Sequence, residues 1–118
     1  MKNSPLRDKS YQFAIKIVEM ARALQGNKKE YVLSKQVLRS GTAVGALIRE
    51  AEFAQSRADF IHKMSIPLKE ANETAYWLNL LFDTNYIYIA VFKDLNNDCQ
   101  ELIAMLVSTV KTTKSRNP

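Results

Sequence analysis

The stretch from Ile61 to Phe82 constrains the fold more than any other part of the sequence, because its apolar residues recur at alternating intervals of three and four. The members of this repeat are Ile61, Met64, Leu68, Ala71, Ala75, Leu78 and Phe82. This spacing is the a/d pattern of helices that pack side by side in bundles. Ser56, followed by Asp59 three residues later, resembles a helix cap. The sequence therefore predicts a helix over residues 57–83 that buries one apolar stripe against other helices.

Three further segments show helical periodicity, over about residues 10–24, 29–54 and 91–112. Their apolar stripes comprise Phe13, Ile17, Met20 and Leu24 in the first, Leu33, Val37, Val44, Ile48 and Ala51 in the second, and Phe92, Leu95, Cys99, Leu102, Leu106 and Thr109 in the third. We expect Gly26 to end the first helix in a left-handed conformation. Only three Gly and three Pro among 118 residues leave few turn formers for a sheet. The short breaks favour an antiparallel up-down-up-down four-helix bundle, all-α, with one domain over residues 1–118.

Pro67 lies in the middle of the third periodic segment. Proline has no amide hydrogen, and its ring crowds the carbonyl group of Lys63 one turn earlier. The apolar repeat nevertheless continues through Pro67 without a slip. We therefore expect a kinked but continuous helix; the alternative is two shorter helices joined at Pro67.

The net charge of +5 is concentrated in the first half of the chain, since residues 1–59 hold eleven basic and six acidic groups and residues 60–118 hold six of each. This charge favours an anionic partner such as RNA, DNA or the acidic face of another protein. The alternative is that it only promotes solubility. The charged N-terminus lacks the apolar run of a signal peptide, and no stretch approaches the length of about 20 apolar residues that a membrane span needs. We therefore expect a cytoplasmic protein without a membrane partner.

Small residues run through the middle of the second helix. Gly41 and Gly45, inside a helix, each cost about 1 kcal/mol relative to alanine. Their benefit is close approach to the backbone, either by a neighbouring helix or by a large aromatic ring, within the subunit or between subunits. The candidate rings are Phe53, Tyr76 and Trp77. We therefore predict close helix packing at both glycines.

Cations recur along one side of the same helix at Lys35, Arg39 and Arg49, with the small residues Thr42 and Ala46 between them. Such a stripe could contact phosphates while the small residues admit a backbone. The alternative is a solvated helix face. The candidate nucleic-acid-binding residues of the first two helices are Lys16, Arg22, Lys35, Arg39 and Arg49.

The sequence contains no constellation typical of catalysis or of metal or cofactor binding. Cys99 falls on an apolar stripe position, where a thiol behaves as a small hydrophobe. The single histidine, His62, is expected at the solvent edge. The carboxylates that could share a metal ion are Glu50, Glu52, Glu70 and Glu73. Ion pairs with Arg and Lys are the favoured interpretation of these carboxylates, and we predict a protein that is not an enzyme and needs no metal or cofactor.

Three stretches of the second and third helices carry a recognisable pattern: Gln36–Ala51, Asp59–Ile66 and Lys69–Thr74. Together they resemble the four-helix bundle proteins of the 23S rRNA intervening-sequence type, over most of the chain. Members of that family are small bacterial proteins, most without an established activity. A related branch, the accessory proteins of diversity-generating retroelements, forms basic barrel-shaped pentamers that bind nucleic acid and a reverse transcriptase.

The resemblance implies a homo-oligomer, with a pentamer expected, and no catalytic centre. It also implies that four recurring polar residues form hydrogen bonds or ion pairs between helices. These residues are Gln36, Arg39, Glu50 and Glu73.

These observations predict a non-enzymatic homo-oligomeric bundle that presents a basic surface to RNA, DNA or a nucleoprotein. Self-association is favoured because Tyr11, Ile15 and Val18 add apolar surface to sides of the first helix that one bundle seam cannot cover. The alternative is a protein–protein interaction scaffold whose charge is incidental. Steep salt dependence of nucleic-acid binding separates the two hypotheses.

Overall fold

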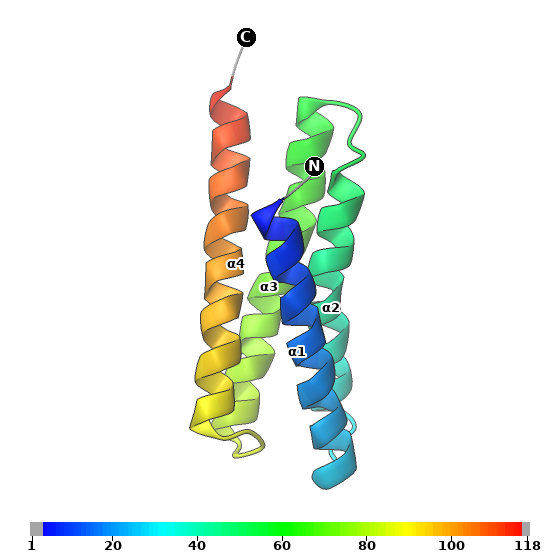
Figure 1. The fold of residues 1–118 in the computed structure, drawn as a ribbon, viewed down its shortest axis with the longest axis vertical. Helices are drawn as coiled ribbons and strands as arrows, with labels where there is room; N and C mark the ends of the chain where they lie inside the picture. The colour runs from blue at the N-terminus through cyan, green and yellow to red at the C-terminus, as the bar shows by residue number, and fades with distance from the viewer. Residues whose placement is uncertain (1–3, 117–118) are drawn as a thin grey trace.

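Each of the four periodic segments is a helix in the computed structural model, which describes residues 4–116. The helices are α1 (Pro5–Asn27), α2 (Leu33–Ala51), α3 (Arg57–Asp83) and α4 (Ile89–Ser115). They run alternately up and down along a body of 53 × 23 × 20 Å, and no strand occurs within residues 4–116 (Figure 1). Helices that follow one another in the chain pack closely, whereas α1 and α4 meet less extensively. The predicted all-α up-down-up-down bundle is confirmed.

Local caps set the starts of two helices. The Ser56 hydroxyl accepts a hydrogen bond from the backbone amide of Asp59 at 3.0 Å, and α3 spans the predicted residues. The Ser4 hydroxyl accepts one from the backbone amide of Arg7 at 3.1 Å, and Pro5 occupies the first helical turn, where a missing amide hydrogen costs nothing. α1 therefore begins five residues before the predicted residue 10.

The connection between α1 and α2 differs from the prediction. α1 continues to Asn27, and no glycine within residues 4–116 has a positive φ, so the prediction that Gly26 ends the helix in a left-handed conformation is wrong. The left-handed residue is Lys29, with a φ of 54°. An α-helix cannot contain that conformation, and α2 begins at Leu33 rather than at residue 29. Other helix ends also differ from the prediction: α2 ends at residue 51 instead of 54, and α4 spans 89–115 instead of 91–112.

The buried stripe of α3 keeps the alternating spacing but follows a partly different set of residues. Met64, Ala71 and Leu78 are buried as predicted. The fully buried positions between and after them are Pro67, Thr74 and Leu81, whereas the predicted Ile61, Leu68, Ala75 and Phe82 are only half-buried. The proline ring is apolar and needs no donor, and the threonine hydroxyl lies 2.8 Å from a backbone carbonyl oxygen, so both residues tolerate burial.

Pro67 lies inside a continuous α3. The alternative of two helices joined at this residue is therefore wrong. Its ring is buried in the bundle, where it adds apolar surface to the core. Tertiary packing thus outweighs the loss of one helical hydrogen bond.

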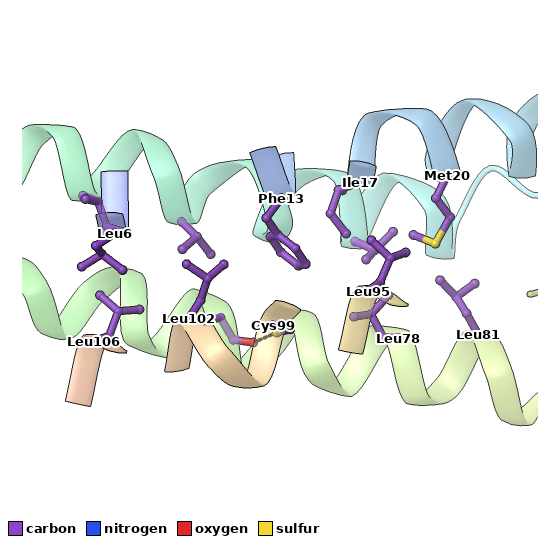
Figure 2. Packing of buried hydrophobic residues seen from close by; sticks show 14 of the residues in the cluster. Leu6, Phe13, Ile17, Met20, Leu78, Leu81, Leu95, Cys99, Leu102 and Leu106 are labelled. Atoms are coloured by element: carbon purple, nitrogen blue, oxygen red, sulfur yellow. Dashed lines mark hydrogen bonds between the residues drawn. The ribbon is translucent and has the colours of Figure 1, made fainter. Parts of the chain in front are cut away.

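The core extends along the bundle axis and receives side chains from every helix (Figure 2). Cys99 of α4 lies within it, fully buried, and its thiol donates a hydrogen bond to the carbonyl oxygen of Ala71 at a distance of 3.2 Å. Burial raises the pKa of the Cys99 thiol to about 12, so the thiol stays protonated at neutral pH. The predicted core role of Cys99 is confirmed. Within residues 4–116, no helix carries an apolar stretch long enough to cross a membrane.

Candidate functional site

Lys16, one of the candidate nucleic-acid-binding residues, joins α1 to α4. Its ammonium group lies 2.8 Å from the Asp98 carboxylate and 3.0 Å from the Asp94 carboxylate. Hydrogen bonds to these carboxylates raise the pKa of Lys16. Lys9 continues the row, at 3.1 Å from Glu101 and 3.6 Å from Asp98. The charge of Lys16 is therefore already paired within the bundle.

Arg39 faces α3 and also has internal partners. Its guanidinium donates to the carboxylate of Glu70 at 3.1 Å and to that of Glu73, which also accepts from the indole Nε1 of Trp77 at 2.9 Å. The hydrogen bonds that Glu73 accepts from Trp77 and Arg39 lower the pKa of Glu73. The hydrogen bonds that Arg39 donates to Glu73 and Glu70 raise the pKa of Arg39. Within the predicted stripe of Lys35, Arg39 and Arg49, Arg39 is therefore paired with carboxylates and joins α2 to α3.

A buried hydrogen bond lies next to this ion pair. The Thr74 hydroxyl is 2.8 Å from the Ser40 hydroxyl, and both residues are fully buried. Hence two of the three stretches that carry the family resemblance, Gln36–Ala51 and Lys69–Thr74, meet across α2 and α3. Buried polar groups there must find partners, which fixes the register of the two helices. Gln36 and Glu50 are exposed, and neither side chain makes a hydrogen bond or ion pair within residues 4–116.

The two helix-interior glycines face α1. A Cβ atom at Gly41 would lie 2.9 Å from both Cγ atoms of Ile17, closer than packed carbons approach. A Cβ at Gly45 would lie 3.4 Å from the backbone oxygen of Ser10, which is ordinary contact. The close neighbour is thus a helix of the same chain, and not an aromatic ring; Phe53, one of the candidate rings, is 81% exposed.

The carboxylates that the sequence offers for a metal site have other surroundings. Glu70 and Glu73 face the Arg39 guanidinium, and Glu52 lies 3.5 Å from Arg7. No group of three His, Cys, Asp or Glu side chains that could hold a metal ion occurs within residues 4–116. His62 is exposed.

The positive charge of the chain is more localised than a comparison of its halves indicates. Residues 20–49, here called the basic segment, hold six basic residues and one acidic residue, a difference of +5 that equals the net charge of the whole chain. The basic residues are Arg22, Lys28, Lys29, Lys35, Arg39 and Arg49. Apart from Arg39, none of them forms an ion pair with a carboxylate of residues 4–116, and all are exposed. Arg49 lies over the ring of Tyr11, 5.1 Å from its centroid.

The single carboxylate of the basic segment, Glu30, is buried and binds backbone. It accepts hydrogen bonds from the amides of Val32, Leu33 and Ser34 at 3.2, 3.0 and 2.7 Å. Burial disfavours its charge, but these hydrogen bonds outweigh burial, and the pKa of Glu30 lies below its ordinary value. Glu30 therefore caps the start of α2 and neutralises none of the surrounding cations by direct contact.

The sequence analysis named Arg22, Lys35 and Arg49 as candidates but did not name Lys28 or Lys29, and it did not predict the capping role of Glu30. The adjacent lysines at the end of the first helix were the available signal, since they lie where the local density of acidic groups is low. Lys28 and Lys29 belong to the connection between α1 and α2, at the end of the bundle where α3 also turns into α4 (Figure 1).

Comparison with known proteins identifies relatives of the chain. A solved structure from Bacteroides thetaiotaomicron, a protein of unknown function from the S23 ribosomal protein family, is 55% identical, with a TM-score of 0.89, and the match covers 90% of this chain and 98% of that one. No match is found among curated proteins. The family model of the 23S rRNA-intervening sequence proteins matches residues 2–108. The chain therefore belongs to the 23S rRNA-intervening sequence protein family.

Proposed function

We propose that this protein is a non-enzymatic homo-oligomeric bundle that binds RNA or DNA through the exposed cations of the basic segment. The observation that carries this proposal is that five of the six cations there have no carboxylate partner within residues 4–116, while the one carboxylate is buried against backbone amides. A surface of uncompensated cations attracts phosphates and releases their counterions. The internal pairing of Lys16 and Arg39 removes these two residues from the expected interface.

Neutralising the exposed cations should weaken nucleic-acid binding and flatten its salt dependence. The test variant is the triple substitution Arg22→Gln, Lys35→Gln and Arg49→Gln. Fluorescence anisotropy with a labelled single-stranded RNA, between about 50 and 200 mM salt, should show a loss of affinity of about tenfold or more at the lower salt, and a salt slope reduced by about 2.

A second triple variant controls for total charge. Lys93→Gln, Lys111→Gln and Lys114→Gln remove the same charge from α4 and should change affinity about twofold at most. Equal losses in the two triple variants, absence of binding by the unchanged protein, or binding that does not weaken with salt would contradict the proposed interface.

Self-association rests on apolar residues that the bundle leaves exposed on α1. Tyr11 is 52% exposed and Ile15 is 40% exposed, whereas Val18 is half-buried. Light scattering at micromolar concentration should give a multiple of the 13.5 kDa chain mass, and a pentamer is the assembly we expect. Ile15→Glu places a charge in this surface and should lower the measured mass, whereas Glu19→Gln, also on an exposed position of α1, should leave it unchanged. A mass of one chain for the unchanged protein would refute self-association.

A further inference from the structure

A pocket of about 180 Å³ opens at the end of the bundle where α1 connects to α2 and α3 connects to α4. Met20, Asn27 and Lys28 line it from the end of α1 and the following connection, and Tyr86, Tyr88 and Val91 line it from the connection between α3 and α4 and the start of α4. Its lining is mostly apolar and aromatic, with an amide and an ammonium group at one side. This combination is typical of sites for small molecules and cofactors.

Tyr88 gives the pocket an accessible aromatic ring. Its side chain is 78% exposed, and the ammonium of Lys28 lies 5.9 Å from the centroid of its ring. A cation at this distance is attracted by the ring face. Base stacking on a tyrosine together with a phosphate on a nearby lysine is the usual arrangement in proteins that bind single strands.

The charge on the Lys28 side of the pocket favours an anionic occupant. Among the residues that the structure describes, no Asp or Glu side chain lines the pocket. Lys29 follows Lys28 directly, and the carboxylate of the next residue, Glu30, accepts hydrogen bonds from three backbone amides. A phosphate at the mouth would therefore meet Lys28, with Lys29 next to it in the chain and without a competing carboxylate on the same connection.

We propose that this pocket takes one nucleotide of a single-stranded nucleic acid, with the base stacked on Tyr88 and the neighbouring phosphate bound by Lys28 and Lys29. The inference deepens the proposed function and depends on it, because it places the contact of one base within a surface that otherwise binds backbone phosphates. Neither tyrosine nor lysine selects a particular base, so the site is expected to bind single strands with little sequence preference.

The test compares variants of Tyr88 in the full chain, with a fluorescein-labelled oligouridylate of about 20 nucleotides as the probe. Tyr88→Ala should weaken binding about tenfold, whereas Tyr88→Phe keeps an aromatic ring and should stay within about twofold of the unchanged protein. Phe53→Ala is the matched control, because Phe53 is an equally exposed aromatic residue that follows α2, at the opposite end of the bundle. Thermal melting should show that all three variants fold.

Inorganic polyphosphate as a second probe separates the base from the phosphate. Lys28→Gln should weaken binding of both probes, whereas Tyr88→Ala should weaken binding of the oligouridylate alone. An equal effect of Tyr88→Ala on both probes, or on a polyglutamate peptide of similar length, would overturn the assignment of a nucleotide to the pocket.

The two proposals fail in different ways. If the unchanged protein does not bind the oligouridylate at about 50 mM salt, the proposed function and the pocket both fail. If the Arg22, Lys35 and Arg49 triple variant loses affinity but Tyr88→Ala binds as tightly as the unchanged protein, only the pocket fails.

Discussion

Replacing Glu30 with alanine is expected to lower the free energy of unfolding by about 2–3 kcal/mol, because three backbone amides at the start of α2 lose a charged acceptor. Among them the amide of Ser34 is buried, so water does not readily replace the carboxylate there. Glu30→Gln retains one amide oxygen and should lose roughly half as much. Chemical denaturation at one protein concentration measures both effects.

The stabilisation by Glu30 should depend on pH in a defined direction. The pKa of this carboxyl is lowered by folding from an ordinary value of 4.5, so its contribution is complete above that value and is lost as the pH falls through the folded pKa. The difference in stability between the unchanged protein and Glu30→Gln should therefore be constant near neutral pH and shrink in acid below about pH 4.5.

Glu50 provides a matched control for Glu30 at the other end of the same helix. It is exposed and lies in the last turn of α2, where a negative charge opposes the helix dipole. Glu50→Gln should therefore leave stability unchanged or raise it by a few tenths of a kcal/mol. If Glu30→Gln behaves like Glu50→Gln, or if its effect grows in acid, the capping role of Glu30 is wrong.

The start of α2 shows why sequence periodicity located some helix ends and missed others. The cap of α3 uses Ser56 and Asp59, whose spacing is visible in the sequence, and that helix has the predicted bounds. Glu30 lies in a connection, two residues before the N-cap Val32, and directly follows Lys29, which adopts a left-handed conformation. Lysine and glutamate are good helix formers, so helix propensity predicts that the second helix includes Lys29 and Glu30. In the structure both residues belong to the connection between α1 and α2.

The candidate site was predicted less well than the fold because charges pair across large sequence separations. Lys16 meets a carboxylate 82 positions away, and Arg39 meets one 31 positions away. A count of charges shows where cations outnumber carboxylates, but not which cations face a partner on another helix. The prediction of which α3 residues are buried was partly wrong for a related reason. Thr74, which has a hydrogen-bond partner in the core, is buried where an apolar residue was expected.

Replacing each of the three glycines with alanine tests how closely α1 and α2 approach each other, because the expected change in stability depends on the space around each Cβ atom. At Gly26 a Cβ meets nothing within 4 Å, so Gly26→Ala should stabilise by about 0.5–1 kcal/mol through helix propensity alone. Gly45→Ala makes ordinary contact with Ser10 and should keep part of this gain. Gly41→Ala should instead destabilise by about 1–2 kcal/mol, since the clash with Ile17 exceeds the gain in propensity.

A double-mutant cycle assigns the Gly41 effect to one contact. Ile17→Ala removes the atoms that a Cβ at Gly41 would strike, and the new methyl group then fills part of the resulting cavity. Gly41→Ala should therefore become neutral or stabilising in the Ile17→Ala background, which corresponds to a coupling energy above about 1 kcal/mol. If Gly41→Ala destabilises the protein equally in both backgrounds, the glycine serves another purpose than the approach of α1. If the cycle shows the coupling, the small residues of α2 are explained by packing within one chain, and the outer face of that helix stays available to a partner.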